Sequence, residues 1–255
     1  MDTRPSAPRR APLPRLAVVG QGRLGGALTR ALRDAGASVS GPHGRGFDGT
    51  GADVVLLCVP DEAIAAAAAA VAPGPLVGHC SGATTLEPLA PHEALSLHPL
   101  MTVPGPDAEL RGAPCAIAGS TARARDLAGA IAATLGMDAF AVADDDRAAY
   151  HAAASVAANY LQAVEALAER LAASAGVPRE ALAPLARVAL ERWQADGPAA
   201  LTGPVARGDA ATVARQREAV AERLPAADLA LFDALTAATE RVAADRGAVL
   251  TGASA

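Results

Sequence analysis

Short apolar runs alternate with amphipathic stretches along the first 146 residues of the chain. The runs predict strands at residues 16–19, 38–40, 52–60, 75–82, 94–100, 113–119 and 139–143, and the intervening stretches predict helices at 24–35, 61–71 and 121–135. The run "ADVVLLCVP" (52–60) is apolar almost throughout, which is typical of a strand covered on both faces. Strands that alternate with helices predict an α/β fold with a doubly wound parallel sheet.

The pattern changes after "DDD" (144–146). Residues 147–175, 178–195, 210–223 and 226–244 all predict helices, and no run after residue 147 predicts a strand. Pro178 and Pro225 stand at or near helix starts, where proline is tolerated. We therefore predict a disordered tail at 1–14, an α/β domain at 15–146 and an all-helical C-terminal domain at 147–255.

The stretch "RLAVVGQGRLGGALTRAL" (15–32) places a glycine loop between the first strand and the first helix. Gly20, Gly22 and Gly25 form G-x-G-x-x-G, which in this context is the fingerprint of a dinucleotide site. The first glycine makes the turn, the second lets the backbone approach a pyrophosphate, and the third allows close packing of helix on strand. The α/β domain is thus predicted to be a dinucleotide-binding Rossmann domain, although a turn without a ligand is an alternative. The predicted binding residues in the loop are Gly20, Gln21, Gly22, Arg23, Leu24 and Gly25.

The residues after the second strand indicate which dinucleotide binds. A site for NAD usually has an acidic residue about 20 positions past the loop, where it holds the ribose hydroxyls. Here "SGPHGRG" (40–46) carries no carboxylate before Asp48. His43 and Arg45 stand in its place, and an arginine there can pair with a 2′-phosphate. We predict NADP(H) rather than NAD(H), the alternative being that Arg45 is a solvated loop residue.

Three further strand ends carry candidate residues. Ligands of doubly wound sheets lie beyond the carboxyl ends of the strands. Val59 and Pro60 in "CVPD" are therefore expected to line the path of the cofactor, and Ser81 in "HCSGA" to contact the nicotinamide or the substrate. His98 in "SLHPL" is a candidate catalytic residue, or alternatively fixes the turn before Pro99.

Several motifs together resemble one family. They are "VVGQGRLGGAL", "ADVVLLCVPD", "HCSGA", "SLHPLMTV", "YHAAASVAANYL" and "LTGPVARGD". The chain resembles the Rossmann-like oxidoreductases that carry the C-terminal domain of unknown function 2520. They lie within the wider superfamily of ketopantoate reductase and 6-phosphogluconate dehydrogenase. The resemblance implies a dinucleotide domain, a helical domain that often dimerises, and NAD(P)-linked redox chemistry without a settled substrate. The "HPL" of His98 is also similar to a histidine-proline element of prephenate dehydrogenases.

The first C-terminal helix carries a polar row. His151, Ser155 and Asn159 recur every fourth residue among alanines, so they lie near one helix face. In several superfamily relatives this helix carries a lysine and an asparagine, but all 22 basic residues of this chain are arginine. His151 is thus the expected general acid, Asn159 would orient a carbonyl or imine, and Ser155 would face the substrate. Tyr150 is a further candidate, and the alternative is a row that serves helix packing.

Two other features bear on ligands. Arg207 in "LTGPVARGD" (201–209) anchors an anionic substrate, pairs with Asp209 or, in a dimer, reaches the neighbouring cleft, and Asp209 is placed to cap the next helix. The spacing of His79, His98 and His151 matches no known set of metal ligands, so no metal site is predicted.

Composition narrows the class of protein. A net charge of −5 without a basic stripe argues against nucleic acid as a partner, and no apolar run is long enough for a membrane span. The three cysteines form no CxxC pair, which predicts buried, reduced thiols in the cytoplasm.

These observations predict an NADP(H)-dependent oxidoreductase. It would transfer hydride between the nicotinamide and a small polar carbonyl, alcohol or imine substrate. The family resemblance further implies a homodimer formed through the helical domain. The alternative is an NADP-binding regulatory or scaffold protein without turnover. An epimerase or dehydratase on the same fold is a third reading, which the absence of a carboxylate base in the polar row disfavours.

Overall fold

The computed structural model describes residues 12–251, which divide into two compact units. Unit 1 extends to Val156 and unit 2 begins at Ala157, so the predicted boundary at residue 146 lies about ten residues before this division. Most of the predicted tail, residues 1–11, lies outside the described residues. Leu13, at its end, packs against the core of unit 1.

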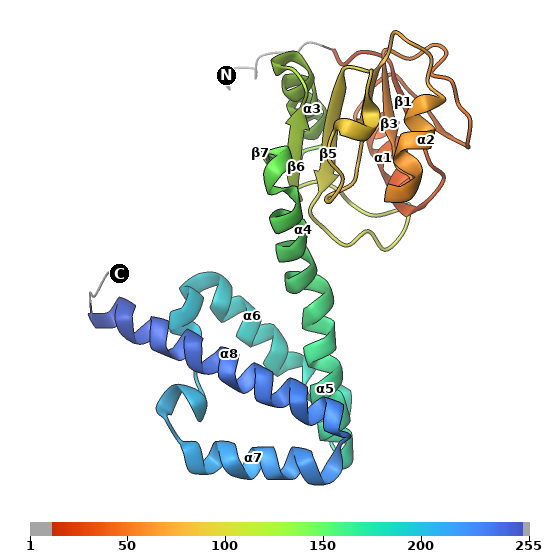
Figure 1. Cartoon of the computed structure of the whole chain (residues 1–255). Helices are drawn as coiled ribbons and strands as arrows, with labels where there is room; N and C mark the ends of the chain where they lie inside the picture. The colour runs from red at the N-terminus through yellow and green to blue at the C-terminus, as the bar shows by residue number, and fades with distance from the viewer. Residues whose placement is uncertain (1–11, 252–255) are drawn as a thin grey trace, which may run out of the picture. The chain divides into compact units, whose positions relative to one another are not determined.

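Unit 1 is built on a seven-stranded sheet within the described residues, in the order β2-β1-β3-β4-β5-β6-β7 (Figure 1). The strands are β1 Leu16–Val19, β2 Val39–His43, β3 Val54–Leu57, β4 Leu76–His79, β5 Ala94–Pro99, β6 Pro114–Gly119 and β7 Asp138–Ala141. Each lies within or beside a run that predicted a strand. In the sheet, β2 lies on one side of β1, and β3 lies on the other side of β1. The order of the strands along the sheet therefore reverses beside β1. Ligands of such sheets bind at this reversal.

The predicted sheet was parallel throughout, but one pair of neighbouring strands is antiparallel. The pairs from β2 to β5 are parallel, but β6 runs antiparallel to β5, with Leu95 opposite Gly119 and Pro99 opposite Cys115. A parallel neighbour needs a crossover, usually a helix, whereas the connection at 100–113 contains no helix and returns directly. The apolar run of β6 predicted a strand but carries no information on its direction. The helix α3 (Ala122–Thr134) then makes β7 parallel to β6.

Helices cover both faces of the sheet, as the fully apolar strands require. Alternate residues point to opposite faces, so Leu16 and Val18 join one buried cluster while Ala17 and Val19 join the other. The first cluster packs under α1 (Arg23–Asp34) and α3. The second packs under the short helix α2 (Ile64–Ala69), which the 3₁₀ turn Asp61–Ala63 precedes.

The rest of the described chain is helical. The helices are α4 Arg147–Ser155, α5 Leu161–Ser174, α6 Ala183–Asp196, α7 Ala210–Arg223 and α8 Ala226–Thr251. Short 3₁₀ turns lie at Glu87–Leu89, Asp144–Asp146, Arg179–Ala181, Gly197–Ala200 and Val205–Arg207. The predicted continuous helix 147–175 is interrupted by a π-helical turn at Val156–Tyr160, where the two units divide. No helix in residues 12–251 is both long and apolar enough to cross a membrane.

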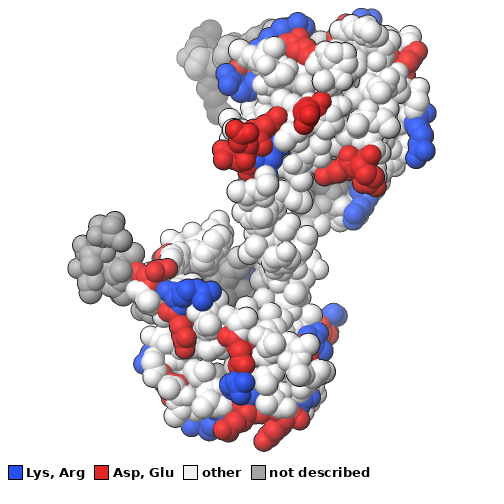
Figure 2. Space-filling view, in the orientation of Figure 1, with Lys and Arg blue, Asp and Glu red and all other residues white. Residues whose placement is uncertain are grey.

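Charged side chains are scattered over the surface of both units. Acidic and basic groups lie among wide uncharged areas on the face seen in Figure 2.

Candidate functional site

The glycine loop after β1 has the three properties that its motif predicts. Gly20 has a φ of 115°, and a Cβ there would overlap the carbonyl oxygen of Cys58. A Cβ on Gly25 would overlap the carbonyl oxygen of Gly20, so helix and turn are in direct contact. A Cβ on Gly22 would meet no atom within 4 Å. The backbone at Gly22 is therefore bare and open to a close ligand.

The start of α1 leaves backbone donors available beside this opening. The N-cap residue is Gly22, which has no side chain to accept from the first N–H groups, and the first turn contains no acidic residue. Arg23 is exposed and Leu24 half-buried in that turn. Uncapped N–H groups at the positive end of a helix attract a phosphate.

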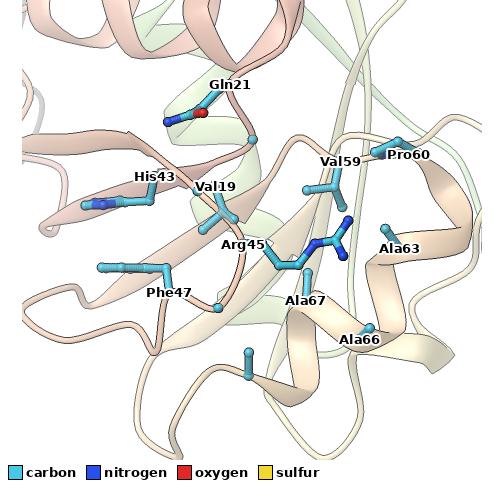
Figure 3. A pocket seen from close by; sticks show the side chains of 14 residues that line it. Val19, Gln21, His43, Arg45, Phe47, Val59, Pro60, Ala63, Ala66 and Ala67 are labelled. Carbon is cyan, nitrogen blue, oxygen red and sulfur yellow. The ribbon is translucent and has the colours of Figure 1, made fainter.

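A cavity of about 450 Å³ adjoins the loop. It lies between the glycine loop, the loop after β2 and the start of α2 (Figure 3). Six of the predicted cofactor-binding residues line it, namely Gly20, Gln21, His43, Arg45, Val59 and Pro60. The other predicted ones, Gly22, Arg23, Leu24, Gly25 and Ser81, are not among its lining residues.

Arg45 supplies the positive charge of the cavity. Figure 3 shows its side chain extending into the space between Val59 and Ala67. It forms no salt bridge with any described residue. An unpaired guanidinium at the rim of a cavity suits an anionic group of a ligand.

Apart from the amide of Gln21, the other walls of the cavity are apolar or aromatic. The α2 side contributes only the small side chains of alanines 63, 66, 67 and 70. On the opposite side the rings of His43 and Phe47 stack, with centroids 3.8 Å apart and planes inclined by 8°. Ser40 Oγ lies 2.9 Å from Nε2 of His43 and fixes that ring. The cavity thus offers flat apolar surfaces with one cation.

Ser81, after β4, is engaged within its own loop. Its hydroxyl donates to Oδ2 of Asp61 at 2.8 Å and accepts from the backbone N–H groups of Ala83 and Thr84 at 3.1 and 2.9 Å. A hydroxyl has one proton to donate. The predicted contact of Ser81 with a nicotinamide or substrate would therefore have to displace one of these bonds.

Both ring nitrogens of His79 are likewise engaged in hydrogen bonds within this loop. His79 is fully buried, its Nδ1 accepts from the backbone N–H of Ser81 at 3.2 Å, and its Nε2–H donates to the carbonyl oxygen of Thr85 at 3.0 Å. Burial lowers the pKa of His79, which keeps the ring neutral. His79 therefore fixes the "HCSGA" loop.

His98 and His151 come together over Gly82. A Cβ on Gly82 would lie 3.0 Å from Nε2 of His98 and 3.1 Å from Cδ2 of His151. The hydroxyl of Tyr150 lies 2.6 Å from Nδ1 of His98. Burial, with smaller effects of His151 and Arg147, lowers the pKa of His98 to about 4. The carboxyl ends of β4 and β5 and the first turns of α4 thus share a polar cluster, all of it within unit 1.

Arg147 holds this cluster in place. Its side chain is buried, and Nε donates to Oδ1 of Asp144 at 2.7 Å while the terminal nitrogens donate to the Ser96 hydroxyl and the Ser81 carbonyl oxygen. Oδ2 of Asp144 accepts from the backbone N–H of Leu86 at 2.9 Å. The buried charge thereby ties α4 to the ends of β4 and β5.

The sequence of this chain matches one family model. Residues 113–239 match a domain of unknown function, DUF2520. The chain carries a DUF2520 domain. The matched region begins at β6 of unit 1 and continues through most of unit 2. No curated protein matches the sequence of this DUF2520 protein at a significant level.

Several solved structures share the fold of the DUF2520 protein. A protein from Thermotoga maritima superposes with a TM-score of 0.75 at 22% identity, over 90% of this chain and 98% of its own. A proposed NADP oxidoreductase from Bacteroides fragilis gives 0.74 at 19%, with the same coverage. A reductive aminase from Aspergillus terreus, in complex with NADPH and ethyl levulinate, gives 0.67 at 16%, over 90% and 94% of the two chains. At these identities the likeness shows the fold: a Rossmann-type domain followed by helices.

Three predicted residues, Ser155, Asn159 and Arg207, lie at the end of unit 1 or in unit 2. Ser155 is half-buried at the end of α4, and Asn159 is exposed in the π-helical turn, where the four-residue spacing of an α-helix no longer holds. The predicted row is thus interrupted between these two residues. Asp209 caps α7 as predicted by accepting from the N–H of Thr212, and hydrogen bonding from Thr212 is the main cause that lowers the pKa of Asp209. Arg207 is exposed in unit 2 and makes a small further contribution to that shift.

From the sequence alone, Tyr150 was named only as a further candidate, and Asp61 and Phe47 were not predicted to be residues of the site. Tyr150 contacts His98 across 52 positions, and no local spacing predicts such a pair. Asp61 binds Ser81 over 20 positions in the same way. Phe47 lies close after Arg45 in a chain with only three phenylalanines, and that rarity was a usable signal.

Proposed function

We propose that this DUF2520 protein is an NADP(H)-dependent oxidoreductase. The observation that carries the proposal is the bare glycine loop beside a cavity into which Arg45 alone brings a positive charge. The NADPH-bound reductive aminase with the same fold supports it. The substrate is proposed to be a small polar carbonyl, alcohol or imine.

The residues fit the parts of NADP. The pyrophosphate would lie against Gly22 and the uncapped start of α1, and the 2′-phosphate would pair with Arg45. The adenine would contact the alanines of α2 and the stacked rings of His43 and Phe47. NAD lacks the 2′-phosphate, so it forgoes the pairing with Arg45.

The histidine cluster would handle the proton of the reaction. When bound, the nicotinamide supplies or accepts the hydride, and reduction of a carbonyl then needs one proton at the oxygen. His98 is neutral near pH 7, because its pKa is about 4. We therefore assign proton donation to His151, whose ring meets that of His98 at Gly82. His98 would accompany it as a catalytic residue that contacts the substrate.

Replacing Arg45 tests the coenzyme assignment. In Arg45→Ala, the dissociation constant for NADPH should rise about 10- to 100-fold, because a charged hydrogen bond is lost, while that for NADH should stay within about twofold. Arg125→Ala removes an exposed arginine from α3 and is the matched control. Equal weakening of both coenzymes, or of neither, would contradict the role of Arg45.

Turnover separates the enzyme from the alternative of a regulatory NADP-binding protein. NADPH absorbance would be followed against a panel of small keto acids, aldehydes, ketones and imines. Turnover that falls at least about 100-fold in His151→Ala, with unchanged NADPH affinity, supports the enzyme. Tight NADPH binding with no turnover of any substrate in the panel favours the regulatory protein.

We also propose that unit 2 mediates homodimerisation. The described helix α6 exposes Leu185, Val188, Leu190 and Trp193, with 70% of Leu185 and 61% of Trp193 accessible. A groove of about 670 Å³ beside it is lined by residues of both charge signs, including Glu165 on α5 and Arg187 on α6. An isologous contact requires such a self-complementary surface.

The mass in solution tests the dimer. Leu185→Glu should shift the mass from dimer to monomer in light scattering, whereas Ala211→Glu, which adds the same charge to α7, should not. A monomeric wild-type protein at high micromolar concentration would contradict the proposal.

The cytoplasm is the compartment we propose. Cys58, Cys80 and Cys115 are all free thiols, and Cys58 Sγ lies 3.6 Å from Cys80 Sγ without a disulfide. Free thiols of this kind fit a reducing compartment.

A further inference from the structure

The hydrogen bond between Tyr150 and His98 raises the question of which partner donates. The Tyr150 oxygen is 2.6 Å from Nδ1 of His98, and the two rings meet edge to face at 88° with centroids 5.6 Å apart. A neutral imidazole carries its single proton on either Nδ1 or Nε2. The direction of this bond therefore decides which nitrogen of His98 is protonated.

The surroundings favour donation by Tyr150. Burial raises the pKa of Tyr150 to about 12 and lowers that of His98 to about 4, so both groups are neutral near pH 7. The lone pair of an imidazole nitrogen is more basic than a phenol oxygen, which makes it the better acceptor. Among residues 12–251, the Tyr150 hydroxyl has no hydrogen-bond partner other than His98. If it accepted from His98, its own proton would lack a protein acceptor.

The other nitrogen of His98 is available to a ligand. No described residue forms a hydrogen bond with Nε2, yet no buried side-chain nitrogen or oxygen among the described residues lacks a partner. Nε2 is therefore accessible. The ring edge that carries Nε2 packs close to Gly82, where an added Cβ would lie 3.0 Å from Nε2 of His98 and 3.1 Å from Cδ2 of His151, so the two rings meet at this glycine.

We propose that Tyr150 is a positioning residue that donates to Nδ1 of His98 and so holds the proton of His98 on the accessible Nε2, beside His151. The inference rests on the proposed function and narrows its substrate class. A neutral Nε2–H donates, so it binds an atom with a lone pair, such as a carbonyl or alcohol oxygen. An iminium nitrogen has no lone pair and cannot accept this bond. The geometry thus selects carbonyls and alcohols over iminium ions.

The tautomer can be measured without a substrate. In ¹⁵N-histidine-labelled apoprotein, two-bond ¹H–¹⁵N spectra near pH 7 should show Nε2 of His98 protonated and Nδ1 as a hydrogen-bond acceptor, with His98→Gln identifying the signals. In Tyr150→Phe, which keeps the ring, the His98 signals should move toward a mixture of tautomers. A wild-type His98 protonated on Nδ1, or a tautomer unchanged in Tyr150→Phe, overturns the proposal.

Kinetics then tests the substrate class. With NADPH, wild-type protein should reduce small aldehydes or ketones, and adding methylamine to form iminium ions should not raise the rate. Tyr150→Phe should lower kcat for the carbonyl about tenfold or more, with NADPH affinity and melting temperature unchanged. Faster reduction of the iminium ion than of the carbonyl overturns the proposal.

The experiments distinguish failure of the proposed oxidoreductase function from failure of the proposed role of Tyr150. Wild-type protein that binds no NADPH, or that reduces no member of the panel, overturns the proposed function and the substrate role of His98 with it. The tautomer experiment still reports separately whether Tyr150 holds the ring of His98.

Discussion

The two units of the DUF2520 protein use their apolar residues in opposite ways. Unit 1 buries apolar side chains on both faces of its sheet, and Leu28, Leu56 and Leu95 are fully inaccessible. Among the described residues of unit 2, only Leu167 and Val220 belong to the buried apolar set. Its helix α6 instead presents large apolar side chains to solvent.

The two units therefore differ in how much of their stability comes from apolar surface buried within the unit itself. Each square ångström of apolar surface removed from water contributes about 25 cal/mol, so unit 1 gains most of that free energy from its own packing. Unit 2 leaves much of the same surface uncovered, and large exposed apolar areas typically mark contact surfaces. We therefore expect substitutions in unit 1 to affect folding, and those on α6 to affect association.

The largest difference between the two units should appear in the free energy of unfolding when a leucine of each unit is truncated to alanine. Leu28→Ala removes a fully buried side chain of α1 and should lower the free energy of unfolding by about 3–4 kcal/mol. Leu185→Ala removes an exposed side chain and should change the free energy of monomer unfolding by less than about 0.5 kcal/mol. Urea denaturation at low protein concentration measures both. Equal losses in the two variants would show that α6 is covered within the monomer.

Acid should destabilise unit 1 by a somewhat smaller amount. His98 remains neutral in the folded protein down to a pH of about 4, its folded pKa, whereas in the unfolded chain its pKa is the ordinary 6.5. The unfolded state therefore binds more protons between these values. The free energy of unfolding should fall by about 3 kcal/mol as the pH falls from 6.5 to 4, and His79 adds to this in the same direction.

His98→Gln should remove most of that pH dependence. All five histidines of the chain lie at or before residue 151. Residue-resolved hydrogen exchange of the wild-type protein should therefore show the acid-induced loss of stability in unit 1. A pH dependence confined to unit 2 would be incompatible with this assignment.

Loss of the α7 cap should give the smallest effect, and it should be confined to unit 2. Asp209 accepts from the backbone N–H of Thr212 at 3.0 Å, and Asp209→Ala leaves that donor without its side-chain partner. Hydrogen exchange in the first turn of α7 should become faster, while exchange in unit 1 stays unchanged. Asp209→Asn keeps an acceptor oxygen and should restore most of the protection.

The elements of unit 1 were predictable because local signals agree there. The apolar run at β3 and the glycine loop predicted a buried strand, a turn and a helix in order, and Gly20 and Gly25 have the close contacts that the motif requires. The antiparallel direction of β6 was not predictable, since it depends on the path of the 100–113 connection. The π-helical turn Val156–Tyr160 was also missed, because an alanine-rich stretch carries no sign of it.

The candidate site was predictable only where its residues lie close in sequence. His43 ends β2 and Arg45 stands two residues later, so their order in the sequence was enough to predict both beside the ligand, and both line the cavity. The partners of Ser81 and His98 come from elements that the sheet brings together, and only the structure identifies them. Ser81 illustrates the consequence, because the hydroxyl that was predicted to contact the nicotinamide or the substrate is bonded to Asp61.

The alanine-lined side of the cavity bears on how the coenzyme preference of such a protein can change. The coenzyme we propose would meet only methyl groups on the α2 side, which neither attract nor repel a group at the ribose 2′ position. Under the proposed function, discrimination between NADP(H) and NAD(H) falls to the short segment from His43 to Phe47, and we expect exchanges within that one loop to favour conversion to the other coenzyme. Natural or directed evolution could make that conversion without rebuilding the sheet or its helices.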